Sequence, residues 1–359
     1  MILVWNPGSS SLKYEIFETD RFLRSKQSGS VSLVVNSGIS GHDRAVRFLY
    51  SHIVDSGLID QIKMVGVRVV HGGGAIRDEA EISDEILAKI SELSKFAPLH
   101  NPGAVLTIKE SKKIFKVPHR AFFDTAFFEK MPIEAKKYPI PEIINEEIAI
   151  QKYGFHGISH EYIYNTAGGE KLGKTITLHL GAGSSVCAIF EGRPIDTSMG
   201  FTPSEGLIMQ TRAGDIDSGL VLYLAKEKGI AETDKILNNK SGLAGVSETS
   251  GEMLDILYLS GIKIQDDEYK PPKKLKKSPE GEKLAKMALT MFIRRIQKYI
   301  GSYAALMNGV DTIVFSGKIG YGSGEIRKII MDKMDFLGDV KCVAVEPDEE
   351  RAIANKLVK

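Results

Sequence analysis

The sequence contains only two cysteines, which excludes the kinds of site that need several. Cys187 and Cys342 lie far apart, and neither has a second cysteine nearby. Metal and redox motifs of the C-x-x-C type require cysteines in pairs. We therefore expect two buried thiols in a reducing cytosol.

The sequence also lacks an excess of either charge and any long apolar run. Lys+Arg 47 against Asp+Glu 46 leaves a net charge of +1, which gives no overall field for nucleic acid or an anionic membrane. No apolar run approaches the ~20 residues of a membrane-spanning helix. Met1 leads directly into Ile2–Trp5, without the basic region of a signal peptide. We expect a cytoplasmic protein in which any phosphate-binding charge is local.

The chain is long enough for two domains. It has 359 residues, of which 43% are hydrophobic and 26% charged. This composition is typical of globular proteins, and single cores stop growing at about 250–300 residues. We predict two domains, each with its own interior.

The N-terminal stretch predicts a β-hairpin with a polar tip. An apolar run at Ile2–Trp5 and an alternating run at Leu12–Phe17 flank the turn Asn6–Ser11. Backbone N–H groups in such a tip can form a concavity for phosphate, and Lys13 can add a charge. Taken alone, a plain serine-rich turn is the better interpretation.

The same plan recurs at Thr175–Phe190, where two apolar strands flank a glycine–serine tip. Aligning Gly8 with Gly183 also aligns Ser9 with Ser184 and Ser10 with Ser185. We therefore predict a duplicated domain whose two halves each offer a phosphate-binding hairpin to a shared cleft.

Three residues of the first half are candidates for a site. Arg68 lies inside the apolar strand Met64–Val70, where its charge must be answered by a carboxylate or an anionic ligand. His100 stands between two prolines in a rigid segment. Asp124 lies in the predicted strand Arg120–Phe127 and is a candidate for orienting Arg68 or His100.

The second half adds the stretches Tyr153–His160 and Asp196–Asp217. Together they supply a histidine, an arginine and apolar residues within glycine-rich turns. This is what a phosphoryl-transfer site needs around a small anion.

The remaining patterns predict further elements. The helices are His42–Ser56, Ser83–Ser94 with Ser83 as N-cap, Gly103–Phe115, Asp234–Ser241, Leu284–Met307 and the segment after Pro347. The other strands are Val31–Asn36, Thr312–Phe315 and Val340–Val345, and the loops are Ser241–Ser247, the solvated Lys263–Lys283 and the glycine-rich turn Ser316–Ser323, of a kind that commonly packs a nucleotide against backbone.

The motifs together resemble those of acetate kinases, in the acetate and propionate kinase group of the actin-like ATPase superfamily. They span nearly the whole chain in the family's order and are NPGSSSLK, VRVVHGGG, FAPLHNP, FDTAFF, KYGFHGISH, HLGAGSSV, DTSMGFTPSEGL, TRAGDID, KSGLAGVS and EPDEERAIA.

The resemblance implies an α/β fold of two duplicated ribonuclease-H-like domains with an active-site cleft between them. We expect an N-terminal domain at 1–147, to which 347–359 returns, and a C-terminal domain at 148–346 on the nucleotide side. Acetate kinases resemble one another in being homodimers, usually through the second domain, and we expect the same here. The stretch before the last strand is shorter than in typical members, which would trim that surface.

The resemblance also implies roles for individual residues. Asn6 and Glu349 would hold Mg²⁺ or Mn²⁺, Arg68 would bind the carboxylate substrate, and Asp124, His156, Arg212 and Arg68 would be catalytic. The substrate pocket maps to Val70, Leu99, Phe155 and Pro203, with His100 as a further active-site histidine. The nucleotide side maps to Lys13, His179, Leu180, Gly181, Ala182, Gly183, Glu252, Met253, Leu254, Lys318, Ile319, Gly320, Tyr321 and Gly322.

The implied chemistry is phosphoryl transfer between ATP and acetate, which gives acetyl phosphate and ADP. A carboxylate with a pKa near ~4 is already ionised at neutral pH, so this nucleophile needs no base. It needs alignment and positive charge, which Arg68, Arg212, His156 and magnesium would supply. We expect Asp124 to orient its neighbours and not to transfer a proton.

Three departures from the family pattern fall on the adenosine side. Asparagine is usual where this chain has Ala182, the triplet Glu252–Leu254 lacks the usual arginine, and Lys318 replaces the first glycine of the adenosine loop. The donor could therefore be pyrophosphate in place of ATP. A propionate kinase is a further hypothesis, and so is a non-catalytic sensor of nucleotide or acyl phosphate.

Overall fold

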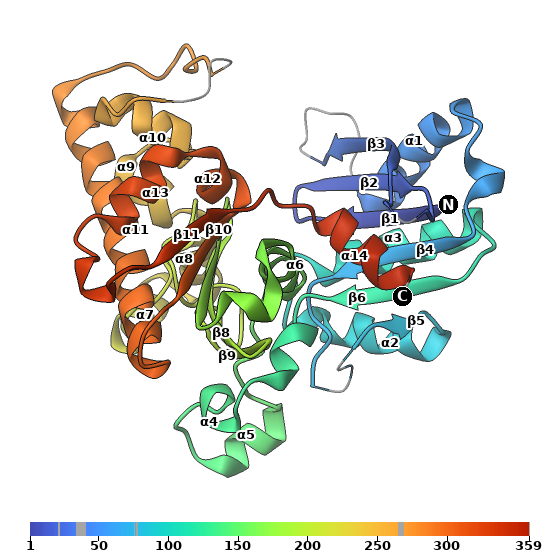
Figure 1. Ribbon diagram of the computed structural model, residues 1–359, viewed down its shortest axis with the longest axis horizontal. Coiled ribbons are helices and arrows are strands. Elements are labelled where there is room, and N and C mark those ends of the chain that lie inside the picture. Colours follow the sequence, from blue (N-terminus) through green and yellow to red (C-terminus); the bar gives the residue numbers. More distant parts are fainter. Residues whose placement is uncertain (21, 34–40, 75, 77, 265–268, 359) are drawn as a thin grey trace. The chain divides into compact units, whose positions relative to one another are not determined.

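The structure is a computed structural model that describes residues 1–20, 22–33, 41–74, 76, 78–264 and 269–358 (Figure 1). The chain forms two compact units. The first consists of Met1–Glu129, Phe155–Tyr162 and Asp348–Lys359, and the second of Lys130–Gly154 and Ile163–Pro347. The boundaries predicted from the sequence were residue 147 and, for the return of the chain, residue 347.

The described part of the first unit contains a six-stranded sheet in the order β3-β2-β1-β4-β6-β5. The first three strands pair antiparallel, β1 pairs parallel with β4 and β4 with β6, and the short β5 is antiparallel to β6. The strands are β1 (Ile2–Pro7), β2 (Ser11–Phe17), β3 (Ser25–Ser32), β4 (Met64–Val69), β5 (Ala80–Glu81) and β6 (His119–Phe123).

Both faces of this sheet are covered, as the period-two alternation of β1 requires. Leu3 and Trp5 belong to a core shared with α1 and α3, whereas Ile2 and Val4 pack in a second core with α14 (Figure 1). The helices are α1 (His42–Asp55), α2 (Asp84–Glu92), α3 (Asn101–Ile114) and α14 (Glu349–Leu357), with the 3₁₀ turns η2 (Ile59–Gln61), η3 (Leu93–Lys95) and η4 (Ala126–Lys130).

The described part of the second unit contains a five-stranded sheet in the order β11-β10-β7-β8-β9. Its main core packs the long helix α11 and the helix α10 against this sheet. The strands are β7 (Thr175–Leu180), β8 (Ser184–Phe190), β9 (Arg193–Thr197), β10 (Thr312–Ser316) and β11 (Lys341–Ala344). The helices are α4 (Ile133–Lys136), α5 (Glu142–Ile148), α7 (Ser218–Lys228), α8 (Ile230–Asn239), α9 (Gly242–Ser247), α10 (Met253–Ser260), α11 (Pro279–Leu306), α12 (Gly317–Gly322) and α13 (Gly324–Met331), with η5 (Gly169–Leu172) and η6 (Asp335–Leu337), while α6 (Gly157–Ala167) has residues in both units.

The two sheets share one topology, which confirms the predicted duplication. The order β3-β2-β1-β4-β6 corresponds to β9-β8-β7-β10-β11, with the same parallel and antiparallel pairings. The predicted serine alignment was wrong by two residues. Ser184 and Ser185 are buried in β8 and pair with Leu180 and His179, so the exposed Ser9 matches the tip residue Ala182 instead.

Several local predictions were also wrong. The predicted loop Ser241–Ser247 contains α9, and the predicted turn Ser316–Ser323 contains α12. Residues 25–32 form the third strand, while 34–36 of the predicted strand lie outside the described residues, as do 265–268 of the predicted lysine-rich loop. Cys187 is buried as expected, but Cys342 is exposed because β11 is an edge strand. In the described part of the chain, no helix has the length and apolar character required to cross a membrane.

Candidate functional site

Arg68 lies at the centre of a charged cluster in the first unit. Its Nε donates to Asp124 Oδ1 at 3.1 Å and its Nη2 to Asp124 Oδ2 at 2.6 Å. Its Nη1 donates to Asn6 Oδ1 at 3.0 Å and to Glu349 Oε2 at 2.8 Å. Both carboxylates are largely buried. The positive charge of Arg68, which lies inside an apolar strand, is therefore compensated by carboxylates of the protein itself.

The topology explains why these residues meet. Asn6 lies near the carboxyl end of β1, Arg68 near that of β4, and Asp124 directly follows β6. These three strands are neighbours and parallel, so their carboxyl ends share one edge of the sheet, where ligands of open α/β sheets bind. Glu349 opens α14, which the second core holds against β1.

The cluster is coupled electrostatically. Burial alone would lower the pKa of Arg68, but the Asp124 and Glu349 carboxylates raise it above its usual value. Burial raises the pKa of Asp124, although Arg68 opposes that shift. Arg68 therefore stays charged, and any anion that binds it must replace at least one of the present partners.

Asn6 and Glu349 fit a divalent cation. Magnesium prefers oxygen ligands such as carboxylates and amide carbonyls. Asn6 Oδ1 and Glu349 Oε2 converge on one positively charged group, since both accept from Arg68 Nη1. Two oxygens already directed at one positive charge can hold a metal if the guanidinium shifts.

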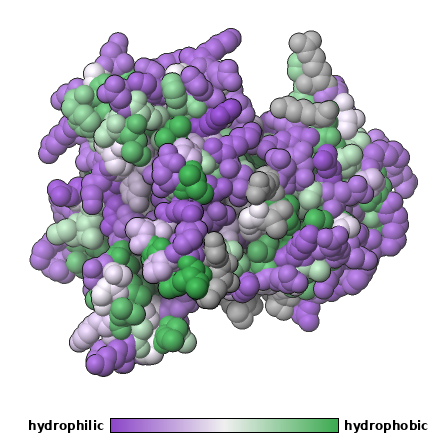
Figure 2. All heavy atoms as spheres, turned by 90° about the horizontal axis from the view of Figure 1, so that it is seen from below, coloured by the Kyte–Doolittle hydropathy of each residue, from purple (hydrophilic) through white to green (hydrophobic). Residues whose placement is uncertain are grey.

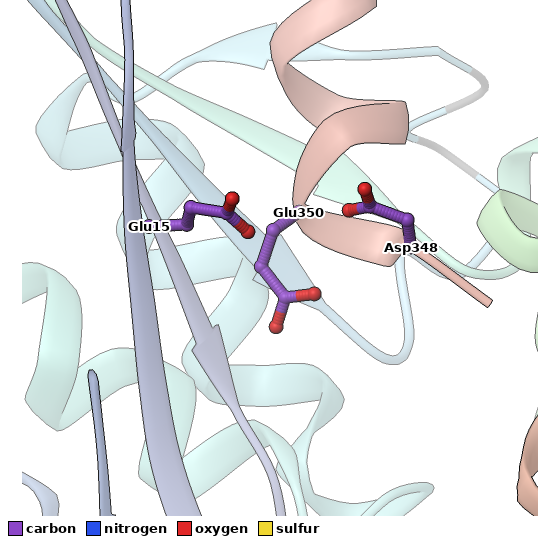
Figure 3. A group of neighbouring side chains, drawn as sticks. All are labelled: Glu15, Asp348 and Glu350. Atoms are coloured by element: carbon purple, nitrogen blue, oxygen red, sulfur yellow. The ribbon is translucent and has the colours of Figure 1, made fainter. Parts of the chain in front are cut away.

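Glu350, which accepts from Asn6, belongs to a group of three neighbouring carboxylates with Glu15 and Asp348 (Figure 3). One carboxylate oxygen each of Glu15, Asp348 and Glu350 lie within 4.8 Å of one another. Burial raises the pKa of both Glu15 and Glu350. Asp348 caps α14 and pairs with Arg351 at 2.8 Å, and Glu350 accepts from Asn6, so these two carboxylates have partners within the protein.

The stretch that contains His156 is fixed onto Asp124. The backbone N–H of Gly157 donates to the Asp124 carbonyl oxygen at 2.9 Å, and the backbone N–H of His156 interacts with the Asp124 carboxylate. A Cβ on Gly157 would lie 2.2 Å from that carbonyl oxygen. His156 has a φ of 60°, which is uncommon for a residue with a side chain and is often found at functional sites. The structure thus brings His156 next to Asp124.

Three residues of the predicted substrate pocket, Val70, Leu99 and Phe155, lie in the first unit. Val70 and Phe155 are buried, whereas Leu99 is 54% exposed. His71, which directly follows Val70, was not among the predicted site residues. Its ring packs edge-on against Phe155 at 5.6 Å between centroids, and burial lowers its pKa to about 4, so it is neutral. The structure also places His100 at the start of α3.

Arg212 belongs to the second unit, as does Pro203. Its Nη1 donates to the Pro203 carbonyl oxygen at 3.0 Å, and burial lowers its pKa. No carboxylate pairs with Arg212 within the described residues, in contrast to Arg68. The first residue of α9, Gly242, packs so closely on the Arg212 backbone that its Cβ would lie 2.7 Å from the carbonyl oxygen. The backbone of Arg212 is therefore fixed by α9, and its guanidinium bonds to the Pro203 carbonyl oxygen and to no acidic group of the described residues.

The predicted nucleotide residues of the second unit gather at the ends of β7 and β10. The tip residue Ala182 accepts from Gln210 N at 3.1 Å, and Gln210 Nε2 donates to Glu252 at 2.9 Å. Gly317 has a φ of 78°, and a Cβ there would lie 2.2 Å from the Leu180 carbonyl oxygen, so α12 packs directly on the strand end.

Not all of these residues are available to a ligand. Met253 is buried in the main core of the second unit, and Ile319 packs against that core. Glu252, Lys318 and Tyr321 are exposed. Lys13 lies in the first unit, on β2, and is also exposed. Of the remaining predicted positions, Leu180, Gly181 and Gly320 are buried, His179, Gly183 and Leu254 are half-buried, and Gly322 is exposed.

Comparison with known proteins identifies the family. A model of the acetokinase family matches residues 1–357. An acetate kinase of Bacillus cytotoxicus is 36% identical over 408 residues, covering 100% of this chain and 98% of that protein. The crystal structure of Porphyromonas gingivalis acetate kinase matches with a TM-score of 0.84 at 31% identity, over 99% of this chain and 98% of that one. That of a propionate kinase from Francisella tularensis matches with a TM-score of 0.85 at 30% identity, over the same shares. The chain belongs to the acetokinase family, and it is a phosphotransferase with a carboxyl group as acceptor and the two-domain α/β fold of the actin-like ATPases.

Proposed function

We propose that this protein catalyses magnesium-dependent phosphoryl transfer between ATP and acetate by direct in-line attack. The observation that supports this best is the largely buried Arg68 at the carboxyl edge of the sheet, where it bonds to the candidate metal ligands Asn6 and Glu349. An acyl acceptor needs a positive group that orients its carboxylate, and the planar guanidinium binds carboxylates through two parallel hydrogen bonds.

Within this proposal Arg68 binds the acetate carboxylate and Asp124 orients Arg68. The attacking oxygen is already anionic, so no general base is required. The bidentate contact between Asp124 and the Nε and Nη2 atoms of Arg68 fixes the plane of the guanidinium, which leaves Nη1 as the donor that changes partner. Val70 and Phe155 line the acyl side, where they limit the length of the acceptor.

Arg212 and His156 are proposed to stabilise the charge on the transferred phosphoryl group. Arg212 lacks an acidic partner in the described structure, so its donors do not have to leave a carboxylate before they bind an anion. Asn6 and Glu349 would hold magnesium, which supplies further positive charge to the phosphate oxygens when bound. On the second unit, Gly181–Gly183 and the exposed residues of α12 are proposed to contact the nucleotide.

The test is acetyl phosphate formation from acetate, ATP and Mg²⁺, compared between wild type and Arg212→Ala. Removal of one such stabilising group should lower kcat by about 10²–10³-fold or more without loss of fold. Arg24→Ala, at a 69% exposed arginine with its own acidic partners, is the matched control and should retain activity. A wild type that is inactive with every donor would support the sensor hypothesis.

Pyrophosphate is the second candidate donor, because Lys318 is exposed at the start of α12 and Met253 is withdrawn into the core. A lysine there can pair with a terminal phosphate in place of an adenosine. Activity with ATP and ADP supports the first candidate. Activity only with pyrophosphate and orthophosphate supports the second, and Lys318→Gly should then abolish it. Comparing acetate and propionate as acceptors separates acetate kinase from propionate kinase activity.

We also propose that the protein is a homodimer that uses α7. None of the residues of α7 is buried, although several of them are hydrophobic. Leu220, Leu222 and Tyr223 are 43%, 72% and 62% exposed. Figure 2 shows that green hydrophobic patches interrupt a mostly hydrophilic surface. An apolar helix face without cover marks an interaction site. Light scattering should give a dimer that Leu222→Glu dissociates, whereas Ile133→Glu, at a 60% exposed isoleucine of α4, should not.

A further inference from the structure

Asn6 can present either an oxygen or an NH₂ group to the proposed cation position, because its side-chain amide can rotate by half a turn. Only the oxygen can bind a metal. Whatever fixes this orientation therefore decides whether Asn6 is a metal ligand. The side chain is 5% exposed, so water does not dominate its surroundings.

Both protons of the Asn6 amide are used by carboxylates. Nδ2 donates to Glu349 Oε2 at 3.0 Å and to Glu350 Oε1 at 2.9 Å, while Oδ1 accepts from Arg68 Nη1 at 3.0 Å. In the opposite orientation, Oδ1 would face two carboxylates and Nδ2 would face a guanidinium. That arrangement opposes like partial charges at every contact, so only one orientation is stable.

The two glutamates contribute differently. Glu349 Oε2 also accepts from Arg68 Nη1, and it is the proposed metal ligand, so a cation would draw it away from Nδ2. Glu350 accepts from Asn6 Nδ2 through Oε1, and a cation held by Glu349 leaves that bond in place. Glu350 is placed by the first turn of α14, whose N-cap Asp348 accepts from Arg351 N at 2.7 Å.

We propose that Glu350 is a positioning residue that holds the Asn6 amide with its oxygen toward the cation position. It does so by accepting an Nδ2 proton, and it acts on the metal only through Asn6. The inference rests on the proposed function, since that function gives Asn6 a metal to bind.

The test is a titration of the full-length protein with Mn²⁺ alone, followed by electron paramagnetic resonance of the free ion. Loss of a group that orients a metal ligand typically costs about 10–100-fold in metal affinity. Glu350→Ala should show a loss of this size. Glu350→Gln keeps an acceptor oxygen and should recover most of the affinity.

A double-variant cycle separates orientation from charge. Because Glu350 acts through Asn6, Glu350→Ala should change Mn²⁺ affinity little in an Asn6→Ala background. Glu15→Ala removes a neighbouring carboxylate that does not accept from Asn6 in the described structure, and it should have only a small effect. Equal losses in Glu15→Ala and Glu350→Ala, a failed rescue by glutamine, or an undiminished loss in the Asn6→Ala background would overturn the proposal.

The failure of this inference can be told apart from failure of the proposed function. If wild type binds Mn²⁺ and forms acetyl phosphate while Glu350→Ala binds Mn²⁺ equally well, only the positioning role is wrong. If wild type is inactive with every donor, the function fails, and the Mn²⁺ titrations still report on the amide. A folded wild type that does not bind Mn²⁺ would overturn the metal assignment and the positioning role together.

Discussion

Replacing Arg68 with methionine should destabilise the protein strongly. The change removes four hydrogen bonds and leaves the Asp124 and Glu349 carboxylates, whose side chains are 2% and 15% exposed, without their cation. Breaking a buried ion pair by removing one partner costs about 3–5 kcal/mol, because the remaining charge stays buried. We expect a loss of that size in the free energy of unfolding near neutral pH.

Arg47→Met is the matched control. Arg47 also joins two carboxylates, Asp43 at 2.9 Å and Glu110 at 2.7 Å, but its side chain is 51% exposed. Water screens the pair with the 36% exposed Asp43, and Lys113 Nζ remains 2.9 Å from the largely buried Glu110 carboxylate once the arginine is gone. Each arginine makes two ion pairs, so the smaller loss expected for Arg47→Met follows from the exposure of Arg47 and Asp43 and from the second cation beside Glu110.

Urea unfolding followed by circular dichroism measures the loss of unfolding free energy in both variants. Lowering the pH should reduce the loss in Arg68→Met. Burial raises the pKa of Asp124 in the folded state, and removal of Arg68 raises it further. A carboxyl group with a raised folded-state pKa destabilises the fold when it is ionised, so the penalty is present above that pKa and is relieved below it. Equal losses for the Arg68 and Arg47 variants, or a penalty in Arg68→Met that does not fall with pH, would refute this reasoning.

Three further predictions follow from other parts of the structure. Gly317→Ala should lower the free energy of unfolding by about 1–3 kcal/mol and raise the KM for the nucleotide, because Gly317 has a φ of 78° and its Cβ would meet the Leu180 carbonyl oxygen. Gly322→Ala is the control, since a Cβ there meets none of the described residues within 4 Å, and melting and kinetic assays should show neither change. Burial lowers the pKa of His71 in the folded state to about 4, so the folded protein keeps this ring neutral. The stability that depends on the neutral ring is complete above about pH 6.5 and is lost as the pH falls toward 4. This change in the free energy of unfolding amounts to about 3 kcal/mol, and a plot of unfolding free energy against pH should be correspondingly flatter for His71→Gln over that range. Val70→Ala should raise kcat/KM for propionate relative to acetate by about tenfold, and an unchanged ratio would remove Val70 from the pocket.

The duplication could be predicted from the sequence because strand–tip–strand patterns are local. Apolar runs and a glycine–serine tip mark Thr175–Phe190 without reference to any other segment. The need to compensate Arg68 was likewise visible in its apolar strand. Asp124 was visible as a candidate partner of Arg68, and the structure pairs the two. The pairing with Glu349 was not visible from the local pattern, because Glu349 is 281 residues away in the sequence.

The short helices α9 and α12 could not be predicted because tertiary contacts fix them. Within α9, the backbone N–H groups of Leu243 and Ala244 donate to the carbonyl oxygens of Met209 and Gln210 at 2.9 and 2.8 Å. Glycine-rich segments of six residues have little intrinsic helicity, so such contacts decide their conformation. At α12, Arg327 supplies the same kind of support by donating to two carbonyl oxygens near its end.

The position of Arg68 Nη1 links the two proposed ligands of the first unit. This one nitrogen occupies both of the oxygens that would bind magnesium, Asn6 Oδ1 and Glu349 Oε2. A cation that takes these oxygens releases Nη1 for an acetate carboxylate, and an acetate that takes Nη1 releases the oxygens for a cation. Binding free energies are reciprocal, so each ligand should tighten the other by the same factor, typically about 5–150-fold where such coupling exists. Acetate affinities measured by calorimetry with and without Mg²⁺ give this factor directly, and independence of the two would mean that Arg68 binds acetate without leaving Asn6 and Glu349.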